Sequence, residues 1–421
     1  MKRIRTLHRT RYGKVVLIFF GTLIAFYLLL FTLWGNRLLT PLIEKSLSSS
    51  LNTPITVQEF VLTRNRFHLL FQDNIGNTLS TQGGFSLLTL RMYAHYRVEG
   101  FQYGGFNPLE KPFKTEGSLS GGIASFNIHG NAILLNGRMI YNLELRRFSL
   151  STVDMQLTDI AYEPLMQLLH YPCETDTTLT GLIALKGFDR RDVSGNIQLQ
   201  SKTSHFKHLP IAEDSNDSTT LKSLLSDPNG RVRPFKSDIT VDLLLSDTAI
   251  LEQFVGIPLG GKSKFHATLK GDEKRLRLHS TSDLAGGIAT LAVDMPALEP
   301  SSLIFDLKHA DAEQTFTLFA LPSPIKGELS AYAELNATQG KMQINVIKGS
   351  SIPNIFKQHY HISQPLIHFD ATINADLSKD GVHYKMLFRS DLNRMEIANT
   401  TTNERMLRDL LKTLPSGSLR R

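Results

Sequence analysis

The chain has 421 residues, with 46 lysines and arginines against 39 aspartates and glutamates, which gives a formal net charge of +7. Six of the basic residues stand within the first fourteen positions, so the rest of the chain is nearly neutral. It contains no basic run with interleaved aromatic residues, which excludes an ordinary nucleic-acid-binding surface. Cys173 is the only cysteine, so no disulfide forms within the chain.

The N-terminus has the pattern of a membrane anchor. Residues 1–14 form a basic tail, and the apolar stretch 15–35 carries no charged side chain. About 20 residues at roughly 1.5 Å each span about 30 Å, the thickness of a bilayer's hydrocarbon core. Because no small-residue cleavage site follows, we interpret the stretch as a retained anchor rather than an export signal.

This anchor predicts where the rest of the chain lies. An excess of lysine and arginine marks the cytoplasmic side of a membrane span, so we expect a single-pass protein with a cytoplasmic N-terminus. The bulk of the chain then lies across the membrane. A large exported domain without disulfides is more typical of the bacterial periplasm than of a eukaryotic cell surface, which places the anchor in a bacterial inner membrane.

Residues 36–54 predict an amphipathic helix at the membrane exit. Its apolar residues recur every four positions, at Leu39, Ile43, Leu47 and Leu51, with Leu38 and Leu42 beside them. Asn52 and Pro54 end the pattern. Such a helix can lie on the membrane surface or cover the end of a sheet, and the pattern allows both.

From residue 55 to residue 400 the main signal is alternation of apolar and polar side chains, which is typical of strands with one solvated face. The Asn136-Gly137 and Asp380-Gly381 dipeptides are hairpin signals. We therefore expect a mainly β fold with an elongated, mostly antiparallel sheet. The clearest predicted strands cover residues 88–98, 139–145, 239–245, 303–307, 329–335, 367–377 and 382–388.

A degenerate repeat interrupts the strands. Three times, an apolar cluster with helical spacing is followed by a proline and then by a new strand, with the prolines at Pro172, Pro258 and Pro322. This favours an elongated repetitive architecture with short crossover helices. Residues 201–236 are polar and rich in turn formers, which predicts an inserted loop. Residues 401–421 predict a C-terminal amphipathic helix and tail, a possible contact for an envelope protein.

Catalytic and metal-binding signatures are weak. Ser204 to Lys207 and Ser323 to Lys326 match a Ser-x-x-Lys spacing, but the companion motifs of acyl-serine hydrolases do not occur. His359, His361 and His368 cluster in sequence without a matching carboxylate motif. We find no phosphate-binding glycine loop and no zinc-protease motif. The sequence therefore predicts a protein that is not an enzyme and has no metal site or cofactor.

A wide sheet with one apolar face must cover that face. A second sheet would make the chain a series of sandwiches, which the alternation alone slightly favours. If the sheet instead curls on its own, its apolar face lines an open groove that another apolar molecule must fill.

The chain resembles the AsmA-like family, which includes TamB-type inner-membrane-anchored periplasmic proteins and is related to bridge-like lipid transfer proteins. The resemblance rests on the basic tail, the single span and the opening LLTPLIEKSLSSSLNTPITVQEFVL, and on helix-Pro-Gly-strand units such as QTFTLFALPSPIKGELSAYAEL. It covers nearly the full length in architecture. The chain carries no clear copy of the family's C-terminal module, and its part beyond the span is short.

The resemblance implies a curled sheet with an open groove, and a protein of envelope biogenesis that binds or conducts phospholipid acyl chains. Membrane phospholipids and the inner membrane are then the partners. The alternative is a non-enzymatic, membrane-anchored scaffold for outer-membrane or secretion-machinery assembly, in which the apolar face is a dry core. The candidate groove residues are Leu90, Met92, Leu143, Val241, Leu243, Phe305, Ile367, Phe369, Ile373, Tyr384 and Met386.

Overall fold

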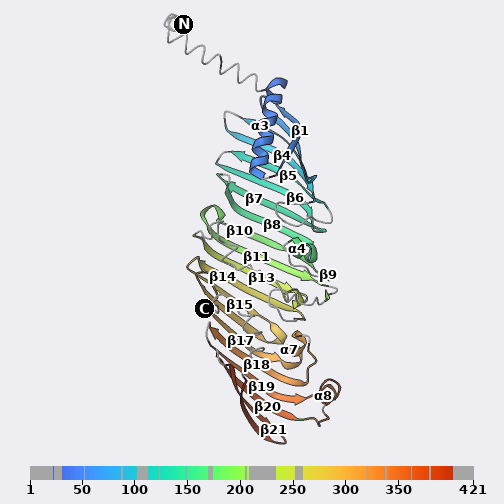
Figure 1. The fold of residues 1–421 in the computed structure, drawn as a ribbon, viewed down its shortest axis with the longest axis vertical. Helices are drawn as coiled ribbons and strands as arrows, with labels where there is room; N and C mark the ends of the chain where they lie inside the picture. Colours follow the sequence, from blue (N-terminus) through green and yellow to red (C-terminus); the bar gives the residue numbers. More distant parts are fainter. Residues whose placement is uncertain are drawn as a thin grey trace, which may run out of the picture. The chain divides into compact units, whose positions relative to one another are not determined.

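The computed structural model describes a mainly β protein (Figure 1). The residues it describes are 22, 31–51, 53–86, 89–101, 112–122, 124–147, 149–168, 174–203, 206–207, 234–251, 259–319, 321–336, 339–361, 363–378 and 381–401. They fall into two compact units, Met1–Leu150 and Ser151–Arg421, each of which has its own ladder of paired strands.

The predicted anchor lies almost wholly outside the described residues. Within the described part of the chain, no helix combines the length and the apolar character needed to cross a membrane. The predicted cytoplasmic tail and the predicted C-terminal helix also fall outside it, except for Thr401, which ends the last strand.

Unit 1 begins with helix α3 (Leu33–Leu51), which lies along strand β1 (Ile55–Leu62). The helix starts three residues before the predicted membrane-exit helix and so includes the last residues of the predicted anchor. Three of its side chains accept hydrogen bonds from backbone N–H groups of β1. Asn36 Oδ1 accepts from Leu62 at 3.2 Å, Glu44 Oε1 from Val57 at 2.8 Å, and Ser48 Oγ from Ile55 at 3.0 Å.

These hydrogen bonds give partners to backbone N–H groups on the outer edge of β1, which is the free edge of the unit. Within the described part of unit 1, β1 pairs with a strand on one side only, namely β2 (Arg66–Asp73), so the N–H groups on its other edge have no strand partner. Such an edge is a template for aggregation unless it is covered. Because the acceptors lie on one side of α3, the polar side of the helix caps the edge strand.

The rest of unit 1 is an antiparallel meander. Each strand pairs with the next along the chain from β1 to β7. The predicted hairpin at Asn136-Gly137 is present one residue earlier, because Leu135 and Asn136 both have positive φ and Gly137 already begins the next strand. The strands after β1 are β2 (Arg66–Asp73), β3 (Thr78–Ser86), β4 (Arg91–Gly100), β5 (Phe113–Gly122), β6 (Ser125–Leu134) and β7 (Gly137–Arg146).

One predicted strand begins later than expected. The alternation suggested a strand over residues 88–98, but β4 starts at Arg91. Leu90 has a φ of 52° and is 55% exposed in the turn before the strand, so it belongs to neither face of the sheet. The apolar residue at the correct spacing is therefore a turn residue, which the structure places before the strand that carries Met92.

Unit 2 extends the same strand-to-strand pattern with one exception. Its neighbouring strands are antiparallel except for β11 and β13, which run parallel. The segment between them contains most of the predicted insertion 201–236. A parallel pair requires a crossover from one end of the strands to the other, which explains why a long polar segment stands at this point. The strands of the ladder are β8 (Ser149–Ala161), β10 (Thr178–Lys186), β11 (Asp192–Lys202), β13 (Lys236–Leu245), β14 (Ser263–Asp272), β15 (Arg275–Ser282), β16 (Ile288–Pro296), β17 (Ser302–Asp311), β18 (Ile325–Asn336), β19 (Gly340–Ser351), β20 (His368–Ser378), β21 (Gly381–Ser390) and β22 (Arg394–Thr401).

Short helices line one border of this sheet. They follow β8, β13, β17 and β19, and the pairing directions make all four of these strands end on the same side. Figure 1 shows α4, α7 and α8 along that side. The parallel step is what brings the end of β13 to this border, because an antiparallel partner of β11 would end on the other side. The helices are α4 (Tyr162–Leu168), η2 (Thr248–Leu251), α7 (Ala312–Leu318) and α8 (Pro353–Tyr360).

The repeat seen in the sequence corresponds to the first three of these helices. A recurring backbone feature precedes three of the four, since Asp159, His309 and Lys348 have positive φ three to five residues before the start of α4, α7 and α8. At all three positions the strand register shifts, which marks a bulge. A bulge bends its strand and re-aims the chain that follows. The sequence pattern missed α8.

We expect the edge cap of β1 to be measurable by hydrogen exchange. Replacing Glu44 with alanine removes the acceptor of the Val57 N–H, and a lost hydrogen bond to a charged group costs about 1.5 kcal/mol. The Val57 amide should then exchange about tenfold faster. Lys45→Ala, which changes the exposed neighbour of Glu44, serves as the control and should leave that rate unchanged. Equal rates in both variants would show that α3 does not protect the edge.

Candidate functional site

The strand register of unit 2 gathers apolar side chains on one face. Opposite residues of paired strands share a face, and one such row runs through Ala331, Ile344, Ile373, Met386 and Ile397. From β8 to β22, the pairing keeps the mainly apolar residues of each strand on this same face. We call this surface the apolar face. Its other members include Met155, Ile183, Ile197, Val241, Ala267, Leu278, Val293, Leu303, Phe305, Leu335, Met342 and Tyr384.

The opposite face of unit 2 is polar and carries ion pairs between neighbouring strands. His266 Nδ1 lies 2.6 Å from Asp242 Oδ1, and Lys385 Nζ lies 2.6 Å from Glu396 Oε1. Arg275 binds both carboxylate oxygens of Asp294, at 2.8 and 3.0 Å, and this holds the pKa of Asp294 below its usual range. These are exposed pairs, which fix register more than they stabilise the fold.

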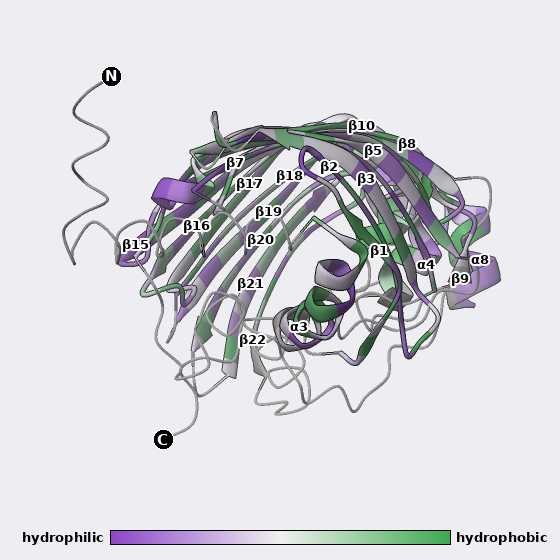
Figure 2. Ribbon diagram, turned by 90° about the horizontal axis from the view of Figure 1, so that it is seen from above, coloured by the Kyte–Doolittle hydropathy of each residue, from purple (hydrophilic) through white to green (hydrophobic). Residues whose placement is uncertain are grey.

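Exposure distinguishes the inner face of the sheet from the outer one. Apolar residues that fall on the polar face are well exposed, as at Leu182 (50%) and Ile304 (40%). On the apolar face, Ile344 and Ile373 are only half-buried, although no strand packs on top of them within the described residues. A curved sheet crowds the side chains on its inner side. We conclude from the exposure that the apolar face is the concave one of the sheet, whose curvature from β15 to β22 is visible in Figure 2.

Part of the apolar face is covered near the helical border. Helix α7 and the short turn η3 (Leu284–Gly286) pack there against a buried cluster that includes Leu307, Ala310 and Ala312. Ala310 and Ala312 are completely buried. The cover reaches only one side of the sheet, and toward β22 the face becomes open, with Met395 48% and Ile397 41% exposed.

This arrangement corrects one expectation. Among the described residues, the only other sheet is a two-stranded piece of β9 (Glu174–Thr175) and β12 (Phe206–Lys207). It is too small to cover a face built from strands of eight to thirteen residues. The series of sandwiches that the alternation alone slightly favoured is therefore wrong. The sheet curls, and no second sheet among the described residues closes its concave face.

The candidate groove residues of unit 2 all lie on the apolar face. Phe369 stacks on Phe388 with ring centroids 4.9 Å apart, and Ile367 lies just before β20 with its backbone N–H on Ser351 Oγ at 2.9 Å. The half-buried candidates on the apolar face are Val241, Leu243, Phe305, Ile367, Phe369, Ile373, Tyr384 and Met386.

Unit 1 has an apolar face of the same kind, with Met92 of β4 and Leu143 of β7 on it. A row across its middle is filled by the chain itself. Tyr96 and Tyr141 join their hydroxyls at 2.6 Å above Gly117 and Gly130, which stand between them in the row. Burial, with the hydrogen bond to Tyr141, raises the pKa of Tyr96.

The glycines under this tyrosine bridge are required by the close approach. A Cβ at Gly130 would lie 2.6 Å from the Tyr96 hydroxyl and 2.7 Å from that of Tyr141. The sequence showed the apolar alternation of β4 and β7 but gave no signal for this bridge, because the two tyrosines are 45 residues apart.

The predicted membrane-exit row of α3 is turned inward. Leu39, Ile43 and Leu47 are half-buried, whereas Leu38 and Leu42 are exposed at 64% and 63%. The side chain of Leu51, the last residue of the helix, lies outside the described part. The row with the best four-residue spacing thus faces the sheet, and the neighbouring row faces outward.

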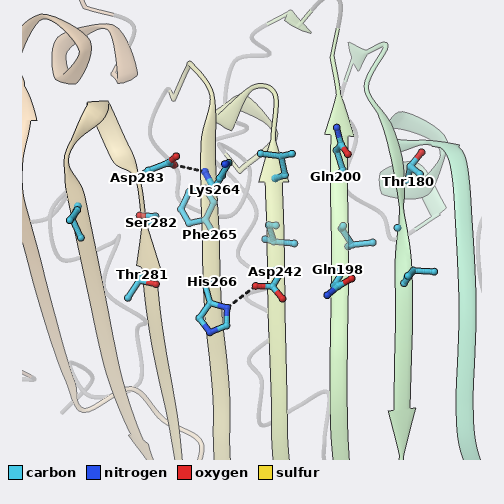
Figure 3. Close-up of a pocket in the computed structure, with 16 residues that line it drawn as sticks. Thr180, Gln198, Gln200, Asp242, Lys264, Phe265, His266, Thr281, Ser282 and Asp283 are labelled. Atoms are coloured by element: carbon cyan, nitrogen blue, oxygen red, sulfur yellow. Dashed lines mark hydrogen bonds and ion pairs between the residues drawn. The ribbon is translucent and has the colours of Figure 1, made fainter.

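A trough of about 710 Å³ on the polar face of unit 2 is lined by residues of six strands, from β10 to β16 (Figure 3). By register, one wall carries Gln200 and Lys264, and the other carries Gln198, Asp242 and His266. The floor between the walls is backbone, because the intervening residues, such as Leu243 and Phe265, turn their side chains to the apolar face. Apart from ordinary polar alternation, no pattern in the sequence predicts this trough.

The weaker chemical signatures resolve into structural contacts. Ser323 Oγ donates to the Ile325 carbonyl at 2.6 Å, while Lys326 pairs with Glu313 at 3.5 Å, so this Ser-x-x-Lys spacing does not join its two ends. His361 ends α8, and His368 pairs with Asp391 at 3.4 Å. In the described ranges no cluster of three or more histidine, cysteine or acidic side chains is arranged to hold a metal ion. Ser204 lies outside those ranges.

In comparisons with known proteins, no family model, no curated protein and no solved structure matches this chain.

Two aspartate substitutions separate the covered part of the apolar face from the open part. Leu307→Asp places a charge in the buried cluster under α7 and should cost more than about 4 kcal/mol of unfolding free energy. Ile373→Asp places the same charge in the open part and should cost only about 1–2 kcal/mol, because water reaches it. Urea denaturation of the full chain in detergent measures both. Losses of equal size would mean that the open part is a dry core.

Proposed function

We propose that this protein binds and conducts phospholipid acyl chains along the apolar face of its curled sheet, as an inner-membrane-anchored periplasmic protein of envelope biogenesis. The observation that carries the proposal is the apolar face of unit 2. It continues from β8 to β22, it is concave, and most of its side chains are half-buried without a second layer over them among the described residues.

The dimensions of the face suit an acyl chain. Thirteen strands spaced about 4.8 Å apart give a path on the order of 60 Å across the strands of unit 2. An acyl chain can lie along such a path because every strand offers the same chemistry on the apolar face, namely aliphatic side chains with scattered aromatic rings. Burial of each methylene is worth about 0.8 kcal/mol.

The same chemistry favours movement over fixed binding. Hydrophobic contact is non-directional, and neighbouring strands present similar side chains on the apolar face. An acyl chain that shifts by one strand therefore loses and regains a similar area of apolar contact. Head groups stay outside the apolar face, where water and polar side chains solvate them. Nothing in this scheme is cleaved, in keeping with our hypothesis that the protein is not an enzyme.

The AsmA-like resemblance agrees with this proposal through the opening helix-strand unit and the helix-proline-strand units. The structural counterpart of the first is α3 followed by β1, and the counterparts of the second are the helices along one border of unit 2.

The scaffold hypothesis retains one specific observation, the trough on the polar face. Its walls carry amide, carboxylate, imidazole and ammonium groups beside the apolar side chains of Leu182, Leu244 and Ile288, within one depression of about 710 Å³. A polar segment of an envelope protein would find hydrogen-bonding partners there. The two functions use opposite faces of the sheet, so they are separable by experiment.

A photocrosslinking scan along β20 tests the proposed function in cells. The photoreactive amino acid p-benzoylphenylalanine is placed in the full chain at Phe369 or Ile373 on the apolar face, and at Asp370 or Thr372 on the polar face. After irradiation, phospholipid adducts are identified by mass spectrometry. We expect adducts at Phe369 and Ile373 only, because successive strand residues point to opposite faces. Adducts absent from all four positions, or equal at all four, would contradict the lipid path, and protein adducts at Asp370 and Thr372 alone would favour the scaffold.

A further inference from the structure

Helix α3 presents an exposed apolar stripe on the side away from the sheet. Trp34, Leu38 and Leu42 follow one another at intervals of four residues and are 73%, 64% and 63% exposed. Residues four apart lie on one side of a helix. Leu33, at the start of the helix, is 79% exposed as well. Large apolar side chains exposed together in this way mark an interaction surface.

The helix cannot bury this stripe by rotating. Its opposite side is held on β1 by the hydrogen bonds to Asn36, Glu44 and Ser48, and Asn36 is itself only 7% exposed. At the start of the helix, the ring of Phe31 stacks near that of Phe85 in β3, with centroids 6.5 Å apart. The stripe is therefore held outward from unit 1 along the first two turns of α3.

The composition of the outward side identifies the partner. Arg37 and Lys45 are exposed beside the stripe, and Glu44, the one acidic residue of α3, faces β1. From Lys45 onward the outward side becomes polar, with Ser46 and Ser49 also exposed. Tryptophan and leucine flanked by lysine and arginine are characteristic of the interface between bilayer and water, where cations meet phosphate groups.

The preceding sequence also indicates a bilayer. Residues 15–31, which lead directly into α3, contain no charged side chain. The stripe is thus continuous in sequence with a segment that we expect to cross a membrane. A second copy of this chain would leave Arg37 facing Arg37 or Lys45 in a stripe-to-stripe contact, without acidic partners on the outward side.

We propose that the segment from Trp34 to Leu42 is immersed in the headgroup region of a phospholipid bilayer, with Arg37 and Lys45 on lipid phosphates. This rests on the proposed membrane attachment and deepens it, because α3 then holds the β1 edge of unit 1 at the membrane surface. A helix that simply continued straight out of the membrane would carry Leu42 about 12 Å beyond Trp34, into water.

Spin-label accessibility measures the immersion directly. The full chain, with Cys173 replaced by serine, is reconstituted in nanodiscs of phosphatidylcholine and phosphatidylglycerol and labelled at L38C, L42C or S49C. Ser49 is the matched control, because it lies on the same side of the helix as Leu42, seven residues further on. We expect labels at 38 and 42 to be relaxed by oxygen and shielded from a water-soluble nickel chelate. The label at 49 should be accessible to the chelate. If all three labels are equally accessible to the chelate, or if labels at 38 or 42 show dipolar coupling between copies, the proposal is wrong.

The single tryptophan gives a second readout that needs no label. The expected span already holds Trp34 at the bilayer, so the tryptophan is moved along α3 in the variant W34F/L42W and, as the matched control, in W34F/S49W. Brominated phospholipids should quench the emission of W34F/L42W several-fold more strongly than that of W34F/S49W. Leu42 and Ser49 are both exposed, so each variant should fold. Equal quenching in the two variants would overturn the proposal. The crosslinking scan along β20 remains an independent test of lipid binding, so failure of one is distinguishable from failure of the other.

Discussion

Backbone pairing between neighbouring strands is the constraint on which the rest of this structure depends. Pairing fixes the register, and because side chains alternate across a strand, the register decides which face each residue joins. In unit 2 the register keeps the mainly apolar residues on one face from β8 to β22. A slip of one residue at any pair would move apolar side chains to the polar face. The bulges at Asp159, His309 and Lys348 shift the register only near the ends of their strands, where the helices begin.

The helices along one border follow from the same pairing. In an unbroken antiparallel meander, every second strand ends on the same side of the sheet. Because β11 and β13 are parallel, these two neighbouring strands end on the same side instead of on opposite sides. It is this parallel pairing that places η2 on the border of α4, α7 and α8. The cover of the apolar face is therefore confined to one side, and the face stays open elsewhere. The architecture differs from a sandwich because the sheet curls instead of recruiting a second layer.

The sequence predicted the parts of this fold that depend on local pattern. Alternation identified strands such as β13, β18 and β21 and assigned their apolar sides, since the period of two is visible within each strand. Turn chemistry placed the hairpin near Asn136. The pattern failed where tertiary geometry decides. Leu90 continues the alternation of β4 but lies in a turn, and the alternation itself is compatible with both a sandwich and a groove.

Features made by residues far apart in sequence were not predictable. Tyr96 and Tyr141 meet above two glycines, and nothing local marks that approach. On α3, two leucine rows have nearly the same spacing, and only the hydrogen bonds of Asn36, Glu44 and Ser48 to β1 decide which row faces outward. The trough on the polar face likewise depends on six strands being placed side by side.

The most direct test of the central claim is native mass spectrometry of the full chain, activated until loosely held annular lipids are lost. Three proteins are compared: the native chain, Ile373→Asp on the apolar face, and Thr372→Asp, the neighbouring change on the polar face. If the apolar face holds acyl chains, the native chain and Thr372→Asp will retain phospholipid, and Ile373→Asp will lose it while remaining folded. A folded native chain that carries no phospholipid, or equal retention in all three, would contradict the account.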